Sequence, residues 1–304
     1  MNYTCIMRIF SNLYVIIVNW NLKDDTLDCI TSVLKAGVVT ERIILVDNAS
    51  TDGSVEAIRK QFPALKIIQA ETNLGFAGGT NLGIRYALAQ QADWVFLLNN
   101  DTIVAPDIFS SLARAVKNEP EYGIVAPLIF YFDAPEIIWS AGDRLIPGTL
   151  ATRHLYHGKE KPVNLPSLIP VDFVTGCAML IKSEVLQRIG LFDTSLFMYG
   201  EEVDLVWRAR LAGYPTGCAT QAHMQHKVAR SANRDRPLAR YRRIRNQIIF
   251  YRKYAHHLQL LIMFGLVLLR VIGLGLKDIG SKQTELLAPL IRGWRDGWFS
   301  EIAQ

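Results

Sequence analysis

The chain has 304 residues, of which 50% are hydrophobic and 20% charged, so it contains enough apolar material for a substantial core. This composition excludes a disordered or collagen-like polymer, and the length favours one large domain with or without an appendage. The formal charge of +5 is unevenly spread, because residues 227–254 carry ten cations and one acid, which leaves the rest of the chain at −4.

Short β-branched runs alternate with amphipathic stretches from residue 13 to about residue 130. We predict strands at 13–19, 42–47, 65–70 and 93–101, and helices at 24–37, 54–62, 80–91 and from Pro106 onward. The first apolar run has no small-residue cleavage pattern, so we interpret it as a strand and not as a secretory signal. Continuously apolar strands separated by helices imply a parallel sheet that is covered on both faces. Ligands of such sheets bind at the carboxyl ends of the strands.

The second half of the chain is less regular. Residues 131–170 have no clear period, and we predict loops and short strands that shape a substrate cleft. A strand is expected at 171–181, a short helix at 183–190, and a helix with acids in its first turn at 201–213. Residues 258–276 are apolar except for Gln259 and Arg270.

Polar side chains gather where the predicted strands end. Asn19 and Asp47 each close an apolar run, and Asn99, Asn100 and Asp101 close another. Such residues are often caps or turn formers, but three strand exits that behave alike favour a binding site. A hard divalent cation needs few protein ligands, so the single carboxylate of Asp101 is sufficient to begin a metal site.

Three further patterns are compatible with both chemical and structural roles. The glycine-rich segment 71–83 can approach phosphate or a nucleobase, or it can be a plain loop. Glu201 and Glu202 start a helix, where acids are common, but crowding by like charge also suits a general base. His223 and His226 are three residues apart, and this spacing alone favours solvent-exposed histidines over metal ligands.

Taken together, these segments resemble the family 2 glycosyltransferases of the GT-A fold, in the rhamnosyltransferase-like branch of bacterial polysaccharide assembly. The resemblance spans roughly residues 13–255 and rests on ordered motifs: VIIVNWN, ILVDNASTDGS, ETNLGFAGGTNLGI, VFLLNNDT, VDFVTGCAMLI, GLFDTSLFMYGEEVDLVWRARLAGY and HKVARS. It implies an α/β fold with a mostly parallel central sheet flanked by helices. The basic and apolar composition of the C-terminal region adds a membrane-associating helical segment to this expectation. The expected domains are a transferase domain at 12–235, with a nucleotide-binding half (12–130) and an acceptor-binding half (131–235), and a C-terminal region at 236–304.

The resemblance also implies roles for individual residues. Nucleotide-sugar contacts fall on Asn19, Asp47, Asn73, Gly78, Asn81 and Asn100, and Gly176 lines the acceptor side. Asp101 and His226 are the expected ligands of Mg²⁺ or Mn²⁺, and Glu202 is the expected catalytic base with Glu201 as its competitor. Asn99 departs from the family's D-x-D pattern by one carboxylate, which puts strict metal dependence in doubt.

The implied activity is an inverting sugar transfer from a dTDP- or UDP-sugar, with dTDP-rhamnose as the first choice, to a polyprenyl-pyrophosphate-linked saccharide. The basic segment followed by the apolar one predicts an enzyme docked on the cytoplasmic face of the bacterial inner membrane, peripheral or shallowly inserted. A membrane-spanning helix and a buried helix of a soluble protein are the alternatives for residues 258–276. Nucleic-acid binding is not expected, because no aromatic platform interleaves the arginines. The alternatives are a sugar-phosphate nucleotidyltransferase and a non-catalytic nucleotide-sugar binding protein at the membrane.

Overall fold

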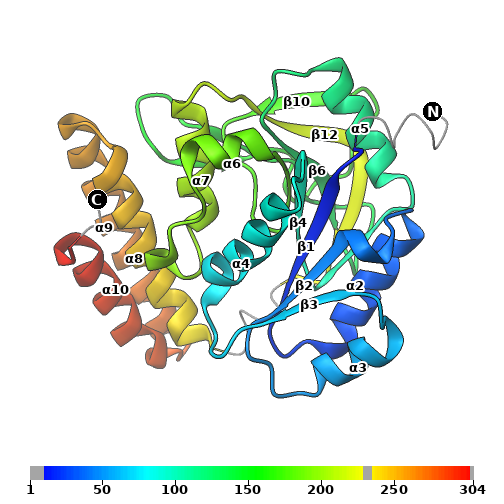
Figure 1. Ribbon diagram of the computed structural model, residues 1–304. Coiled ribbons are helices and arrows are strands. Elements are labelled where there is room, and N and C mark those ends of the chain that lie inside the picture. Colours follow the sequence, from blue (N-terminus) through cyan, green and yellow to red (C-terminus); the bar gives the residue numbers. More distant parts are fainter. Residues whose placement is uncertain (1–9, 229–234, 302–304) are drawn as a thin grey trace.

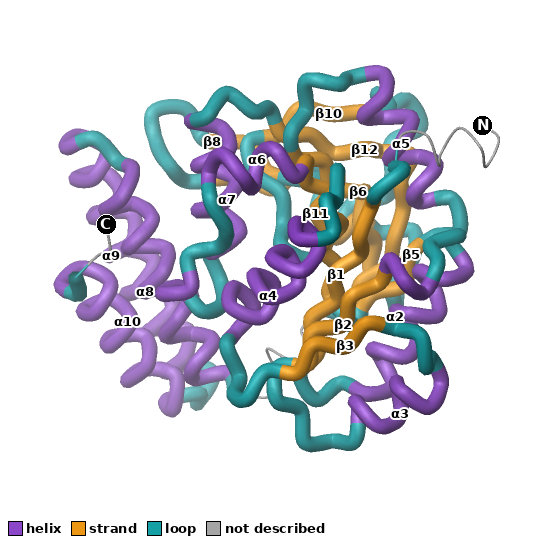
Figure 2. The backbone as a smooth tube through the Cα atoms, in the orientation of Figure 1, coloured by secondary structure: helices purple, strands orange, loops and turns teal. Residues whose placement is uncertain are grey.

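The computed structural model describes residues 10–228 and 235–301. One large sheet has the strand order β10-β12-β6-β11-β4-β1-β2-β3, and β5 and β7 pair with β12 and β6 (Figures 1 and 2). The strands are β1 (Leu13–Asn19), β2 (Ile43–Asp47), β3 (Lys66–Gln69), β4 (Trp94–Asn99), β5 (Thr102–Val104), β6 (Ile124–Tyr131), β7 (Ile138–Ser140), β10 (Leu168–Val171), β11 (Ala178–Lys182) and β12 (Thr216–His226). A separate hairpin pairs β8 (Asp143–Leu145) with β9 (Thr152–His154).

The strands β3, β2, β1 and β4 are parallel, as their apolar sequences predicted. Antiparallel β11 then joins β4 to β6, and β6 and β12 are again parallel. This register brings Asn19 opposite Asp47 and places Val18 opposite Asn99. The predicted strand exits therefore meet at one edge of the sheet.

Helices cover both faces of the sheet (Figures 1 and 2). The helices are α2 (Lys23–Lys35), α3 (Ser54–Gln61), α4 (Gly75–Ala89), α5 (Ile108–Asn118), α6 (Ser183–Ile189), α7 (Glu201–Leu211), α8 (Arg236–Tyr254), α9 (His257–Gly280) and α10 (Leu287–Phe299). One core cluster contains Ile30 of α2 and Leu112 of α5, and the other contains Ile84 of α4 and Leu205 of α7. Ile248 of α8 belongs to this second cluster, so α8 packs into the same core as α4 and α7.

Helix α4 begins earlier than the sequence predicted. We expected it to open at Thr80, but it starts at Gly75, so the glycine-rich segment is mostly helical and not a loop. The N–H of Leu74 donates to Asn48 Oδ1 and that of Gly75 to Asn73 Oδ1, both at 2.9 Å. One distant and one local side chain therefore satisfy the amides at the start of the helix.

Candidate active site

A cavity of about 330 Å³ opens at the carboxyl ends of β1 and β4. Its walls come from segments far apart in the chain: the ends of β4 and β12, the loops before α4 and β11, the start of α7, and α8. Seven of the predicted site residues line it: Asn73, Asn100, Asp101, Gly176, Glu201, Glu202 and His226. The structure thus brings acids that are one hundred residues apart onto one cavity.

Asp101 and His226 face each other on this cavity, and both are buried. Antiparallel pairing of β12 with β5 places His226 opposite Thr102, and the N–H of Lys227 donates to the carbonyl of Asp101 at 2.9 Å. His226 Nε2 lies 3.2 Å from Asp101 Oδ1, yet this oxygen and His226 Nδ1 have no hydrogen-bond partner. A buried carboxylate oxygen without a donor, beside an imidazole nitrogen, fits a shared divalent cation.

The protein would supply only these two ligands. Within residues 10–228 and 235–301 no cluster of three or more His, Cys, Asp or Glu side chains is suited to a metal ion. Mg²⁺ is commonly bound by one or two carboxylates and completes its shell with water and substrate phosphates. The residues present therefore fit a cation that arrives with a phosphorylated substrate.

A network of buried polar side chains lies behind the cavity wall and fixes Asn100. Asn19 donates to Asp47 Oδ1 at 2.9 Å and to Ser50 Oγ at 3.0 Å. Asn100 donates to Asn19 Oδ1 at 3.0 Å and to Thr26 Oγ1 at 2.9 Å. Asn19 and Asp47 do not line the cavity themselves, because they are almost fully buried beneath it.

The amide and carboxylate groups of Asn19 and Asp47 are already engaged inside the protein. Asp47 accepts from Asn19 through Oδ1 and from the N–H of Ser50 through Oδ2, at 3.1 Å. Asn19 Oδ1 also accepts from Thr26 at 2.8 Å. Direct contact of these two residues with a nucleotide therefore stays a prediction, whereas their support of Asn100 is visible.

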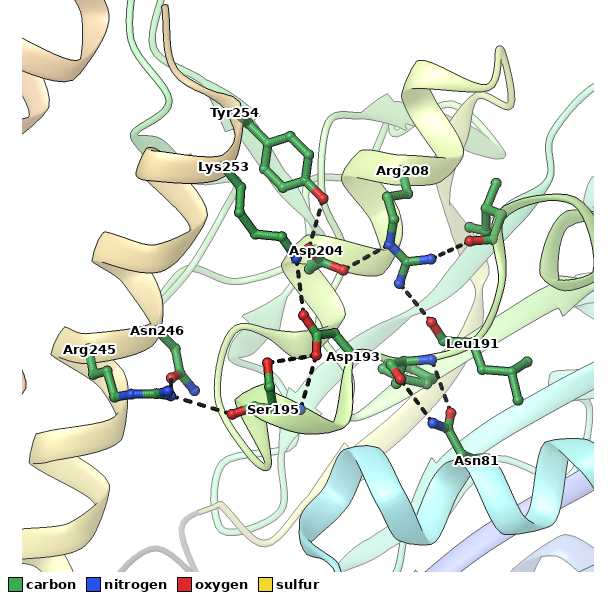
Figure 3. Close-up of polar contacts among 12 residues, drawn as sticks. Asn81, Leu191, Asp193, Ser195, Asp204, Arg208, Arg245, Asn246, Lys253 and Tyr254 are labelled. Atoms are coloured by element: carbon green, nitrogen blue, oxygen red, sulfur yellow. Dashed lines mark hydrogen bonds and ion pairs between the residues drawn. The ribbon is translucent and has the colours of Figure 1, made fainter. Parts of the chain in front are cut away.

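The residues predicted in the glycine-rich segment divide into two groups. Asn73 lines the cavity and accepts from Asn48 Nδ2 at 3.0 Å. Gly78 and Asn81 are buried in α4 and do not line the cavity. Asn81 donates to the carbonyl of Phe192 at 2.9 Å and accepts from its N–H at 3.0 Å, so it joins α4 to the segment before α7 (Figure 3).

Glu202 is the half-buried acid of the cavity. Its Oε2 accepts from the N–H of Gly200 at 2.9 Å, and burial raises its pKa above the usual glutamate range. A Cβ atom at Gly176 would lie 3.4 Å from Glu202 Cβ and equally close to the ring of Phe76, so this glycine lies directly against the stem of the Glu202 side chain. A carboxylate with a raised pKa is a stronger base, and its position on the cavity suits proton removal.

Glu201 is buried more deeply than Glu202. Its Oε2 has no hydrogen-bond partner, and burial together with the charge of Glu202 raises its pKa well above the ordinary value. Because its carboxylate is buried without a hydrogen-bond donor on Oε2, whereas Glu202 Oε2 is held by the N–H of Gly200, Glu201 is a weaker candidate for the base than Glu202.

Sequence reasoning missed the contribution of α8 to the cavity. Arg243 lines the cavity, and its guanidinium lies 4.5 Å from the ring of Tyr199, another wall residue. Arg243 belongs to the segment that we had interpreted only as a run of charge. No periodicity in the sequence distinguished this arginine from its cationic neighbours.

Comparisons with known proteins identify a matching family and several relatives of this chain. A family model described as glycosyl transferase family 2 matches residues 14–190. An N-acetylglucosaminyl-diphospho-decaprenol L-rhamnosyltransferase of Mycobacterium tuberculosis is 29% identical over 220 residues, covering 65% of this chain and 71% of the relative. The galactofuranosyltransferase GlfT1 of the same species is 25% identical, covering 71% of this chain and 70% of the relative.

Two solved structures share the fold. The mannosyltransferase PcManGT of Pyrobaculum calidifontis, in complex with GDP-Man and Mn²⁺, superposes with a TM-score of 0.56 at 16% identity and covers 96% of this chain and 88% of its own. GalNAc-T7 with UDP, GalNAc and Mn²⁺ gives a TM-score of 0.57 at 16% identity. The alignment covers 71% of this chain but only 43% of GalNAc-T7.

Proposed function

Because this chain belongs to glycosyltransferase family 2 and has the GT-A fold, we propose that it transfers a sugar from a nucleoside diphosphate to a lipid-linked saccharide with inversion. The observation that supports this proposal is the common cavity, on which Glu202 and the Asp101–His226 pair both open. Family membership favours sugar transfer over the two alternatives, a nucleotidyltransferase and a non-catalytic binding protein.

The proposed reaction is one in-line displacement. Glu202 takes the proton of an acceptor hydroxyl while that oxygen forms a bond to C1 of the sugar, and the bond from C1 to the diphosphate oxygen breaks. A single displacement inverts the anomeric carbon. Asp101 and His226 would hold Mg²⁺ or Mn²⁺, which neutralises the charge of a leaving diphosphate when bound.

The remaining predicted residues take binding roles in this proposal. Asn73 and Asn100 line the cavity and face the nucleotide sugar, while Asn19 and Asp47 hold Asn100 in place. Gly176 leaves room for the acceptor hydroxyl beside Glu202.

We propose dTDP-rhamnose as the donor and a polyprenyl-diphosphate-linked saccharide as the acceptor. The names of two relatives support the class of reaction: one is a rhamnosyltransferase that acts on a diphospho-decaprenol acceptor, and the other is a galactofuranosyltransferase. UDP-galactofuranose and other UDP-sugars are therefore the donors to compare with dTDP-rhamnose.

Helix α9 supports docking on a membrane surface. By length and composition it is the one helix of the described residues that could cross a membrane, and its most apolar window is only 11% buried. Leu258, Leu261, Leu269 and Leu276 are each at least 66% exposed along the helix. Arg270 does not join this apolar face, because its guanidinium donates to Gln247 of α8 at 2.6 Å. We therefore propose a C-terminal region that lies on the cytoplasmic leaflet of a bacterial inner membrane.

A donor panel tests this function. Purified protein is incubated with a short polyprenyl-diphosphate-GlcNAc acceptor and either dTDP-rhamnose, UDP-galactofuranose, UDP-GlcNAc or GDP-mannose, with Mg²⁺, Mn²⁺ or a chelator. We expect nucleoside diphosphate release and a glycosylated lipid with dTDP-rhamnose, and an inverted anomeric configuration by NMR. Release of pyrophosphate, or no transfer with any donor, would reject the proposal.

A further inference from the structure

The segment that leads into the proposed base is backbone-strained. Phe197, Tyr199 and Gly200 all have positive φ angles, of 61°, 70° and 97°. Such a conformation is unfavourable for aromatic residues and persists only where the surroundings enforce it. Met198, Tyr199, Glu201 and Glu202 line the cavity, so the strained segment 197–200 is part of its wall.

Asn246 of α8 binds this segment from the side away from the sheet. Its Nδ2 donates to the carbonyl oxygens of Leu196, Met198 and Tyr199 at 2.8, 3.1 and 2.7 Å. The residue is 1% exposed, and its own Oδ1 accepts from Arg245 at 2.8 Å. One buried amide group therefore binds three carbonyls of this segment, of which that of Leu196 also accepts from the N–H of Met198 at 2.6 Å.

Neighbouring residues of α8 also contact the segment that leads into Glu202. The guanidinium of Arg242 lies 3.9 Å from the ring of Phe197, and that of Arg243 lies 4.5 Å from the ring of Tyr199. Arg245 reaches the carbonyl of Ser195 at 3.4 Å (Figure 3). On the opposite side, the carbonyl of Phe197 accepts from the N–H of Ala77 in α4 at 3.1 Å. The segment is thus fixed between α8 and α4.

Gly200 passes this constraint on to the base. Its N–H holds Glu202 Oε2 at 2.9 Å, and a Cβ atom at Gly200 would lie only 3.4 Å from Asn246 Cβ. Any shift of the segment 197–200 therefore moves both the hydrogen bond to Glu202 and the first turn of α7.

We infer that Asn246 is a positioning residue for the sugar-transfer reaction: through the backbone of Leu196–Gly200 it sets the orientation of Glu202. This inference rests on the proposed function, in which Glu202 is the base. The C-terminal end of α8 is attached to α7 by separate contacts, because Lys253 and Tyr254 both donate to Asp204 at 2.8 Å (Figure 3). Loss of the Asn246 contacts therefore leaves α8 attached to α7.

The test compares Asn246→Ala and Asn246→Ser with a control on the same helix, Gln247→Ala. Gln247 donates to Tyr251 Oη at 2.8 Å and accepts from Arg270, and it has no hydrogen bond to the strained segment. For each variant we measure kcat, donor KM, the Kd of UDP and of dTDP, thermal stability, and hydrogen exchange of the amides in 196–204.

We expect Asn246→Ala to lower kcat by about 10²-fold, because a misplacement of about 1 Å at a reacting group costs that much. Nucleotide Kd should not change, and exchange should accelerate in 196–204 but not in β1 or β4. Asn246→Ser, which keeps one donor, should recover part of kcat, and Gln247→Ala should keep the wild-type kcat.

Folded Asn246 variants that turn over at the wild-type rate would overturn the inference, as would a fall in kcat that Gln247→Ala reproduces at equal stability. If Asn246→Ala does not fold, Asn246→Ser decides by the same criteria. Absence of sugar transfer by the wild-type protein would instead reject the proposed function, and the positioning role with it.

Discussion

Replacement of Glu202 by glutamine removes the proposed base while preserving its surroundings. Glutamine has the same shape, and its Oε1 can still accept from the N–H of Gly200, so the first turn of α7 and the space beside Gly176 should persist. General-base catalysis typically contributes about 10²- to 10⁴-fold. At about 1.36 kcal/mol for each factor of ten, the barrier should rise by roughly 2.7 to 5.4 kcal/mol.

The pH dependence of kcat gives a second readout of the same variant. Burial raises the pKa of Glu202, and only the ionised form accepts a proton, so wild-type kcat should fall on the acid side at a pH above that of an exposed glutamate. The residual rate of Glu202→Gln should lack this acid limb. Turnover is measured as the rate of nucleoside diphosphate release in a stopped or coupled assay. The Kd values of dTDP and UDP are measured separately by calorimetry, so that effects on turnover and on binding are distinguished.

Glu201→Gln is the matched comparison, since it neutralises the adjacent acid. If Glu202→Gln turned over normally while Glu201→Gln lost activity by the factor given above, the two assignments would be reversed. If neither variant lost activity, general-base catalysis by this pair would be refuted.

Three further predictions concern stability, metal and membrane. The pKa of Glu201 is higher in the folded than in the unfolded protein, so the free energy of unfolding falls as pH rises from the unfolded pKa to the folded pKa. The total loss is about 1.36 kcal/mol for each pKa unit that separates the two states. Glu201→Gln should therefore melt higher than wild type at neutral pH and show no such gain below about pH 4, in a calorimetric series. Asp101→Asn should raise the Mn²⁺ concentration for half-maximal rate by at least about tenfold, because the loss of a partner that only supports a metal ligand already lowers metal affinity by about 10- to 100-fold. An unchanged Mn²⁺ titration would show that Asp101 is not a metal ligand. The double variant Leu261→Ser/Leu269→Ser should bind anionic vesicles at least about tenfold more weakly, because each leucine that is fully buried in the membrane contributes roughly 1.5–3 kcal/mol to binding. The control variant Gln259→Ser should bind as wild type. Equal vesicle flotation by both variants would refute docking through α9.

The parallel half of the sheet was predictable because its strands are apolar without interruption. A strand that is buried on both faces needs no polar alternation, and only a sheet covered by helices on both sides accommodates such strands. The meeting of Asp101 with the strand end at Asn19 followed from the same argument. The pairing of β12 with β5, which brings His226 to Asp101, joins segments more than one hundred residues apart and has no local sequence signal.

The prediction that α4 begins at Thr80 was wrong, also because the deciding contacts have no local sequence signal. A run of glycines and asparagines has a weak helix propensity, so the sequence favoured a loop up to Thr80. In the structure Asn48 and Asn73 accept from the first amides, and the carbonyl of Phe197 accepts from Ala77. Tertiary hydrogen bonds supply here what propensity does not.

The basic segment was understood only as charge, whereas the structure shows that many of its cations are used internally. Arg240 pairs with Asp278, and Lys253 pairs with Asp193 and Asp204. Arg252 donates to two carbonyls at the C-terminal end of α10, those of Gly297 and Ser300. Arg230 and Arg234 lie outside the described residues. Anionic lipid therefore has fewer free partners in this segment than its composition indicated, and the apolar face of α9 becomes the main argument for membrane docking.

The departure at Asn99 is consistent with the charge balance of the cavity. Lys227 follows His226 directly, but its ammonium is paired with Asp25 and Asp28, at 2.7 and 3.0 Å. Asn99 and Asn100 are neutral, so Asp101 is the one carboxylate at the end of β4. One carboxylate and one imidazole hold a divalent cation weakly by themselves, and the two phosphates of a nucleoside diphosphate would provide most of the negative charge. In the proposed arrangement the cation and the nucleotide would depend on each other for binding, so an asparagine at position 99, where the family pattern has an acid, would weaken the site without abolishing it.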